Sequence, residues 1–276
     1  MTRALFDRPP RLRRQPTRLG GARTFASLAG LFLLAALSAA AADPPAAAVA
    51  AYQKARQQLA DGAGPAAALD SFETALRLDP DNLRWGSEYR QAAIAAEAFD
   101  RSIDFFAALT EAHPGSASAR LNLGYAHVDK IPAAGSITQV LLANTALGHF
   151  TQSLELEESW LVRYTRGNSY IHWPAIFGKA KLGIADLERA IELARALPKR
   201  GIHARAWVAL GDGHWRLDDL AKARETWLRG LELYPGTAAL EARLSREGDA
   251  LQEFLDGEYA LGKKVDTDLS ALWEGR

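Results

Sequence analysis

The chain has 276 residues, with 33 basic and 33 acidic side chains and no cysteine. A chain without cysteine has no disulfide, no thiolate metal site, no cysteine nucleophile and no cysteine to carry a lipid anchor. Alanine, leucine, arginine and glutamate dominate while β-branched residues are sparse, so the composition predicts an all-helical protein.

The first 42 residues have the three-part pattern of a secretory signal peptide. They hold seven arginines and a single acidic residue, and the arginines precede an apolar run at residues 25–42 that ends in Ala40-Ala41-Ala42. Small residues of this kind form a cleavage site, so we expect the mature chain to begin near Asp43 and to be periplasmic. The apolar run approaches the length that spans a membrane, so an uncleaved inner-membrane anchor is the alternative.

Removal of this leader changes the charge balance of the chain. The remainder holds 26 basic and 32 acidic side chains, a net charge of −6. Nucleic-acid binding needs lysine and arginine clustered on one face, and the remaining sequence has no such basic patch. We therefore expect no nucleic-acid partner, and contact with a membrane only through the signal segment or through partner proteins.

After the leader, the chain repeats one pattern of small and large apolar residues. In the first copy, Tyr52 is followed by Ala68, Phe72 and Ala75, and Pro80 marks the end. The large residues fall on one helical face, and the alanines allow two helices to cross closely. The residue before a proline is pushed out of helical geometry, so the copy ends in a turn. Each copy therefore predicts a hairpin of two helices.

The second and third copies depart from the pattern. The second is degenerate over residues 85–98, although it ends at Pro114 with the right spacing. The third has ten residues more than the standard spacing after Gly124. The sequence Ser-Ile-Thr-Gln at residues 136–139 is typical of a capping box, which predicts a helix that begins at Ile137 and is about two turns longer than usual.

The fourth copy contains an aromatic loop. Trp173, Ile176 and Phe177 lie in a short extra stretch that is broken by a proline. Large apolar residues in a loop either fold onto the molecule or form a contact surface. We favour packing against the long helix of the third copy. A contact loop for a partner is the alternative.

The fifth copy is the clearest. It contains Trp207, Leu210-Gly211, a small residue at Ala223 followed by Trp227, and Pro235. This pattern resembles the tetratricopeptide repeat, a helical hairpin of about 34 residues. The resemblance implies an all-α fold, a right-handed superhelical solenoid of about five hairpins. The hairpins would lie near residues 49–82, 83–116, 117–159, 160–203 and 204–237.

The resemblance also implies where a partner would bind. In this family, the first helices of the hairpins line a concave surface, and exposed residues one turn apart on them contact the ligand. Lysines that clamp a chaperone carboxylate in some members are missing here, so that activity is not expected. An aromatic and amide-rich groove remains, suited to a peptide, a helix or a small ligand. Its candidate residues are Asn122, Tyr125, Tyr164, Asn168, His172, Asp212, Trp215 and Arg216. As the alternative, Tyr125 and Tyr164 only pack between neighbouring helices.

Residues that carry chemistry are not arranged for catalysis. The six histidines are scattered without a metal-binding spacing, and no nucleophile and base pair stands out. We therefore expect no enzymatic activity, no metal and no cofactor. The leading hypothesis is a periplasmic scaffold that binds a protein or peptide partner in its groove. The alternative is a solute-binding or accessory component of a TRAP-like transport system.

The last part of the chain, residues 238–276, is expected to close the solenoid. A helix is predicted from Ala238 to Leu255, with charged residues on the side that meets water. The tail beyond it is too apolar to stay in water, so we expect Leu272 and Trp273 to dock on the last repeats. A tail that filled the groove would occlude it.

Overall fold

A computed structural model describes residues 43–260 and 266–273 of the chain. The predicted signal peptide at residues 1–42 lies outside the described residues, and so do residues 261–265 and 274–276. Residues Asp43–Arg276 form one compact unit. The described helices include none that is long and apolar enough to cross a membrane.

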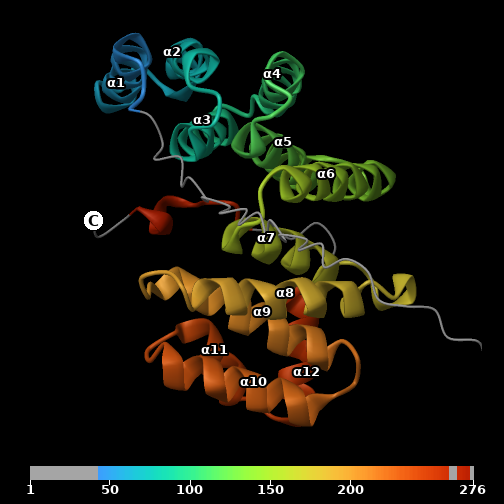
Figure 1. Cartoon of the computed structure of the whole chain (residues 1–276). Coiled ribbons are helices and arrows are strands. Elements are labelled where there is room, and N and C mark those ends of the chain that lie inside the picture. Colours follow the sequence, from blue (N-terminus) through green and yellow to red (C-terminus); the bar gives the residue numbers. More distant parts are fainter. Residues whose placement is uncertain (1–42, 261–265, 274–276) are drawn as a thin grey trace, which may run out of the picture. The chain divides into compact units, whose positions relative to one another are not determined.

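Among the described residues, ten helices pair in chain order into five hairpins, and two shorter helices follow (Figure 1). The described residues contain no strand, so the predicted all-α fold and its five hairpins are confirmed. The hairpins are α1 (Ala46–Ala60) with α2 (Pro65–Leu78), α3 (Leu83–Ala95) with α4 (Phe99–Ala112), α5 (Ala117–Lys130) with α6 (Ser136–Leu156), α7 (Trp160–Ile171) with α8 (Ala180–Ala194), and α9 (Ala204–Trp215) with α10 (Leu220–Leu233). They are followed by α11 (Ala238–Leu244) and α12 (Gly248–Glu258), and four short 3₁₀ helices are η1 (Ile131–Ala133), η2 (Ala175–Phe177), η3 (Gly201–His203) and η4 (Ser270–Leu272).

The predicted crossing points within the hairpins depend on glycine. A Cβ atom added to Gly167 on α7 would lie 3.0 Å from the backbone oxygen of Gly183 on α8. A Cβ atom added to Gly211 on α9 would lie 2.2 Å from Nε1 of Trp227 on α10. The neighbouring backbone at Gly167 and the neighbouring indole ring at Gly211 leave no room for a side chain, which is why the pattern places glycine there.

The turns between hairpins also follow the sequence. Asp79, His113 and Tyr234 each cap the C-terminus of a helix with non-helical backbone angles, and each precedes a proline. The proline ring excludes the helical conformation for the residue before it. The predicted ends of α2, α4 and α10 are therefore confirmed.

Helix α6 is long, as the extra residues of the third copy predicted. It has 21 residues, whereas α4 has 14. The predicted capping box is wrong, because Gly135 is the N-cap residue and no side chain caps the helix. Ser136 already belongs to the helix, and the Gln139 side chain donates instead to the carbonyl of Ala134 at 3.0 Å.

The predicted helix over Ala238–Leu255 is wrong in one respect, because it is two helices. The chain leaves α11 after Leu244 and starts α12 at Gly248, whose φ of 51° falls in the left-handed region and interrupts a right-handed helix. The break lets both helices fold back on the last hairpin. Leu240, Leu251 and Leu255 join Trp227 in one buried cluster, which closes the solenoid.

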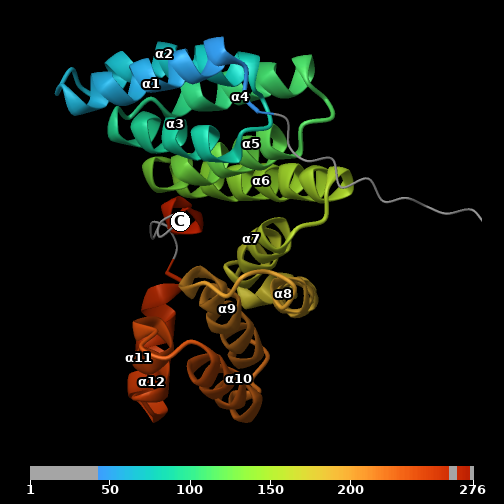
Figure 2. The ribbon, with the colours of Figure 1, turned by 60° about the vertical axis from the view of Figure 1, so that its left-hand side comes forward.

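After α12, the chain returns to the solenoid. We refer to residues 266–273 as the C-terminal segment. Figures 1 and 2 show it, in red, beside the first helices of the middle hairpins, between α5 and α9. Leu269 is 2% exposed and lies in the same buried cluster as Tyr125 and Ala206. The segment is therefore part of the core.

Candidate functional site

The candidate site is the face formed by the first helices α3, α5, α7 and α9, which we call the groove. These helices carry most of the residues that the sequence analysis singled out, and the C-terminal segment lies on them (Figure 2). The predicted docking of Leu272 and Trp273 on the solenoid is confirmed, since both pack against the central cluster. The predicted place on the last repeats is wrong for Trp273, because its ring lies 5.8 Å from the guanidinium of Arg84 on α3, in the second hairpin.

At one end of the groove, Arg90 organises a buried polar cluster. Its side chain is fully buried and donates to Oδ1 of Asn122 at 3.0 Å, to Oδ2 of Asp129 at 2.8 Å and to the carbonyl of Thr267 at 3.1 Å. The guanidinium also lies 4.5 Å from the Tyr125 ring. The Thr267 hydroxyl donates to Oδ1 of Asp129 at 2.5 Å. The C-terminal segment thus completes the hydrogen bonding of a buried ion pair.

Of the predicted site residues, Asn122 and Tyr125 belong to this cluster. They are 1% and 6% exposed. The Tyr125 hydroxyl lies 2.5 Å from the Thr165 hydroxyl on α7, and burial raises the pKa of this tyrosine. Both residues therefore join neighbouring repeats, and a ligand would reach them only through the atoms that the C-terminal segment covers.

At the other end of the groove, Tyr259 fills the space between four predicted site residues. Its hydroxyl donates to Oδ2 of Asp212 at 2.5 Å, and its ring lies 4.8 Å from His172, 6.4 Å from the Trp215 ring and 4.5 Å from the guanidinium of Arg216. Burial raises the pKa of Tyr259 and lowers the pKa of His172. The structure brings these residues together around Tyr259, one of the chain's own aromatic side chains, in the space where the sequence analysis expected a ligand.

Asp212 also holds the last hairpin together. It is fully buried and accepts two hydrogen bonds from Arg243 at 2.6 Å and one from Nε1 of Trp227 at 3.0 Å. The positive charge of Arg243, together with hydrogen bonds from Arg243, Trp227 and Tyr259, satisfies the oxygens of this carboxylate. The geometry gives Asp212 a structural role beside its place under Tyr259.

Tyr164 and Asn168 lie between the two ends. The Tyr164 ring stacks on the Trp160 ring at 5.5 Å, and burial raises the pKa of the Tyr164 hydroxyl. Asn168 is half-buried, and its carbonyl lies 2.9 Å from Nδ1 of His172. Tyr164 therefore packs against its own helix, while Asn168 fixes the ring orientation of His172.

The aromatic loop folds on itself. The Trp173 ring contacts Phe177 at 5.2 Å, and the Lys179 ammonium lies 3.6 Å from the Trp173 ring. Ile176 is 89% exposed and Phe177 is 50% exposed. These two side chains are therefore not buried against α6. Their exposure favours a contact loop, the alternative, over the expected packing against that helix.

The sequence analysis missed the arginines that hold the C-terminal segment. Arg205 donates to Oδ2 of Asp266 at 2.7 Å and to the carbonyl of Asp268 at 3.3 Å, and Arg200 donates to the carbonyl of Leu272. An arginine among packing residues of a helix, as at Arg90, is a signal that could have been used, because arginine is buried only when it is paired.

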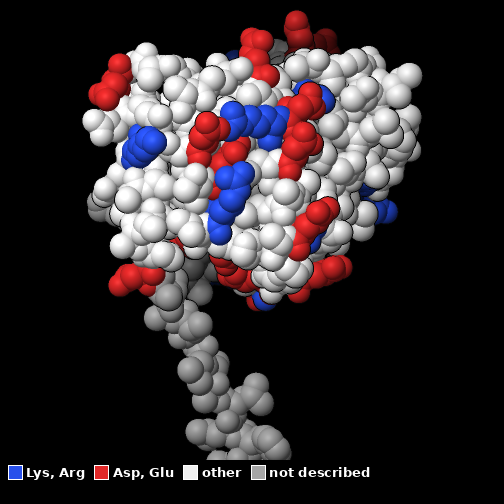
Figure 3. Space-filling model, turned by 90° about the horizontal axis from the view of Figure 1, so that it is seen from above, with Lys and Arg blue, Asp and Glu red and all other residues white. Residues whose placement is uncertain are grey.

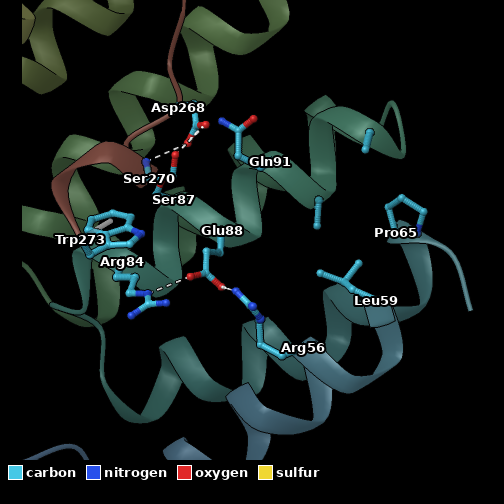
Figure 4. Close-up of a pocket in the computed structure, with 12 residues that line it drawn as sticks. Arg56, Leu59, Pro65, Arg84, Ser87, Glu88, Gln91, Asp268, Ser270 and Trp273 are labelled. Carbon is cyan, nitrogen blue, oxygen red and sulfur yellow. Dashed lines mark hydrogen bonds and ion pairs between the residues drawn. The ribbon is translucent and has the colours of Figure 1, made fainter. Parts of the chain in front are cut away.

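Two hollows flank the C-terminal segment. One, of about 460 Å³, lies between α1, α3 and Trp273, and Figure 4 shows Arg56 and Arg84 both directed at the Glu88 carboxylate there. These ion pairs measure 3.0 and 2.9 Å. The other, of about 500 Å³, lies on the opposite side of Trp273, beside Trp160 and His203. The groove is thus only partly filled.

A third hollow lies away from the groove, between α2 and α4. It has a volume of about 790 Å³ and is lined by both signs of charge, including Glu73, Arg77 and Arg101. Arg101 pairs with Glu73 at 2.7 Å and with Asp70. Figure 3 views the molecule from above, over α1, α2 and α4, and shows blue and red groups side by side. On this face, the charges compensate one another.

Within residues 43–260 and 266–273, no group of three or more histidine, cysteine, aspartate or glutamate side chains is arranged to hold a metal ion. The polar atoms of the groove are instead hydrogen-bond donors and acceptors. Guanidinium groups of Arg90, Arg200 and Arg205 donate to main-chain carbonyls of the C-terminal segment. The rings of Tyr125, Tyr259 and Trp273 lie beside guanidinium groups.

Stacked antiparallel helix pairs, joined through glycine contacts and closed by α11 and α12, define an α-solenoid. No protein-family model matches the sequence, and no curated protein is similar to it at a significant level. The solenoid is similar to a solved TPR protein, TTC0263 of Thermus thermophilus, with 19% sequence identity and a TM-score of 0.53 over 75% of this chain and 100% of the other. The chain therefore has the tetratricopeptide-repeat fold.

Two other solved structures match less well. MamA of Desulfovibrio magneticus RS-1 has 16% identity and a TM-score of 0.48, over 71% of this chain and 99% of the other. YrrB, described as a TPR protein with an unusual peptide-binding site, has 16% identity and a TM-score of 0.48, over 72% of this chain and 92% of the other.

Proposed function

We propose that the protein is a non-enzymatic scaffold that binds a protein or peptide partner in the groove. The observation that supports this most directly is that the groove already holds a stretch of chain. Residues 266–269 lie in it outside any helix, with Thr267 and Leu269 only 3% and 2% exposed. Solenoids of helical hairpins use such surfaces to bind extended partners.

The main-chain contacts support the same proposal. Arg90, Arg205 and Arg200 donate to the carbonyls of Thr267, Asp268 and Leu272 in turn. Contacts to main-chain atoms bind an extended peptide independently of its side chains, and pockets for individual side chains add selectivity. The scaffold therefore suits a peptide better than a globular surface.

We further propose that the protein acts in the periplasm. The support is the charge and apolar pattern of residues 1–42 in the sequence. The partner would then be another envelope protein or an exported peptide, and membrane contact would arise through the signal segment or through that partner. Nucleic acid is not proposed as a partner, because basic and acidic groups alternate on the face in Figure 3.

The proposal can be tested by photo-crosslinking in intact cells. A photoreactive amino acid replaces Arg84, which lines both hollows beside Trp273, and in a matched control it replaces Leu228 on α10, which is 51% exposed. We expect protein adducts from position 84 and few from position 228. Adducts that form equally at both positions, or at neither, would contradict a partner site in the groove.

A thermal-shift screen with small organic solutes separates this function from transport. A ligand that binds only the folded chain raises Tm in proportion to its affinity and concentration. A strong shift with a solute, together with no protein adduct at position 84, would favour the solute-binding alternative.

A further inference from the structure

We propose that the C-terminal segment is a resident occupant of the groove. Partners are acidic peptides that carry a serine or threonine two positions before a leucine, and they must displace the C-terminal segment to bind. The inference rests on the proposed function and goes further, because it names the partner's chemistry and a built-in competitor. Three independent sets of contacts support it.

The first is the unfinished hydrogen bonding of the buried pair Arg90 and Asp129. Within the solenoid, this arginine has Asn122 and Asp129 as hydrogen-bond partners. Thr267 takes a further donor of the guanidinium and the second carboxylate oxygen of Asp129. Buried charges are costly unless their remaining hydrogen bonds are made. The groove therefore requires an occupant that offers one carbonyl and one hydroxyl at this point, as threonine or serine does.

The second is an apolar pocket two residues further along. Leu269 is 2% exposed and lies in the buried cluster that includes Leu121, Tyr125 and Ala206. Thr267 and Leu269 alternate with the exposed residues Asp266 and Asp268. The two buried positions therefore define a hydroxyl, any residue, leucine pattern.

The third is charge. Arg205 pairs with Asp266 at 2.7 Å and also reaches the Asp268 carbonyl, while Arg84 lies over the Trp273 ring and Arg200 reaches Leu272. Of the acidic groups nearby, Asp129 and Glu88 are already paired with arginines, and Glu157 lines the hollow beside Trp160. An acidic segment thus meets an excess of positive charge in the groove, while a basic segment would be repelled.

The contacts also allow displacement. Asp266 and Asp268 are exposed, and an exposed ion pair contributes little. Beside Trp273, the hollow of about 460 Å³ remains open, and Nε2 of Gln91 is buried there without a hydrogen-bond partner among the described residues. Figure 4 shows the Gln91 amide next to Asp268 and Ser270. This amide offers an incoming chain a hydrogen bond that the resident segment does not make.

Covalent attachment decides how strongly the resident competes. A tethered segment meets its site at an effective concentration on the order of millimolar. A free peptide of equal affinity must therefore reach millimolar concentrations to replace it. Loss of the resident from the groove should make the same peptide bind much more tightly.

The test uses a fluorescent peptide with the sequence of residues 265–275 and measures its binding by polarisation. The full-length chain is compared with Leu269→Asp, which places a charge in the apolar pocket and releases the segment, and with the matched control Leu228→Asp on α10. We expect at least tenfold tighter binding to Leu269→Asp than to the other two. Two altered peptides should not bind: one with aspartate at the position of Leu269, and one with lysine at the positions of Asp266 and Asp268.

A second measurement covers the case in which Leu269→Asp does not fold. In the unchanged chain, hydrogen exchange of residues 266–273 should rise when the unlabelled peptide is added at several millimolar. Equal, weak binding to all three folded chains, with no change in exchange, would overturn the inference. A dimer of the unchanged chain that Leu269→Asp dissolves would also overturn it, because the occupant would then be a second copy.

Failure of this inference differs from failure of the proposed function. If crosslinks to a partner form at position 84 while the peptide experiments are negative, the scaffold remains and only the resident competitor and the acidic pattern are lost. If neither experiment finds a ligand, both proposals fail.

Discussion

Single residues decide how closely the helices of each hairpin approach. Gly211 and Trp227 are the sharpest case, because a Cβ atom on the glycine would lie within the indole ring's contact distance. Gly148, in contrast, lies on an exposed part of α6, where an added Cβ atom meets nothing within 4 Å. The same substitution at the two glycines therefore separates packing from helix propensity.

We expect Gly211→Ala to lower the free energy of unfolding by about 1–3 kcal/mol, because the Trp227 ring must shift. Gly148→Ala should raise it by roughly 0.5–1 kcal/mol, because alanine favours the helix. Urea titration of both variants measures the difference. Equal effects of the two substitutions would show that α9 and α10 do not cross at Gly211.

A second prediction at this scale concerns His127. Its ring stacks on His149 at 5.4 Å, and burial, followed by the charges of His149 and Lys130, lowers the pKa of His127 to about 4. The unfolded chain, with a pKa near 6.5, therefore binds a proton before the folded chain does as pH falls. Stability contributed by neutral His127 is present above about pH 6.5 and is lost between there and about pH 4.

We expect the free energy of unfolding to fall by about 1–2 kcal/mol more in the unchanged chain than in His127→Phe between pH 7.5 and 4.5. The lowered pKa values of His172, His203 and His214, which do not contact His127, affect both proteins alike, so the difference reports on His127 and the His149 ring stacked on it. Urea midpoints at the two pH values provide the measurement. Parallel pH curves for the two proteins would contradict the buried, neutral state of this histidine.

At the scale of elements, local patterns in the sequence predicted the hairpins and missed the long-range contacts. Spacing of glycine, alanine and aromatic residues is a property of one hairpin, so α9 and α10 could be read directly from Trp207 to Pro235. The hydrogen bond between Asp129 and Thr267 joins residues 138 positions apart, so no periodic pattern within one hairpin could predict it. The break at Gly248 was missed because its neighbours on both sides favour helix.

The candidate residues show the same limit. Steps of three and four correctly placed His172, Asp212, Trp215 and Arg216 near one another, because they share the faces of α7 and α9. The sequence could not show that Tyr259 enters between them, since that depends on how α12 folds back. Whether any of them binds a partner stays a prediction.

A third prediction concerns the docking of the C-terminal segment as an element. Thr267→Val removes the hydroxyl that donates to Asp129 and leaves a buried carboxylate oxygen unpaired, so we expect the unfolding free energy to fall by about 1–3 kcal/mol. Ser270→Ala removes only an exposed contact to Asp268 and should change it by less than about 0.5 kcal/mol. Thermal unfolding of both variants provides the measurement. If Thr267→Val left the unfolding free energy unchanged, the docking of the C-terminal segment in solution would be contradicted.

At the scale of the whole molecule, the predicted export makes a separate claim about residues 1–42. We expect the protein recovered from the periplasmic fraction to begin near Asp43, because the small residues before it form a cleavage site. N-terminal sequencing and intact mass determine this. A full-length chain confined to the membrane fraction would support the anchor instead.

In the function that we propose, the whole molecule is a scaffold whose ligand surface is partly filled by its own chain. Its lack of cysteine makes this claim directly measurable, because two cysteines introduced by mutation are the only sites that a thiol-reactive spin label can modify. Ser270→Cys places one label on the C-terminal segment, and Leu182→Cys, 55% exposed on α8, places the other on the solenoid.

Pulsed electron spin resonance then gives the distribution of distances between the two labels. We predict a single narrow distribution for the free protein, and a broad, longer one when the peptide of residues 265–275 is added at several millimolar. A distribution that stays narrow and unchanged while the peptide is bound would contradict the claim that partner and C-terminal segment share the groove.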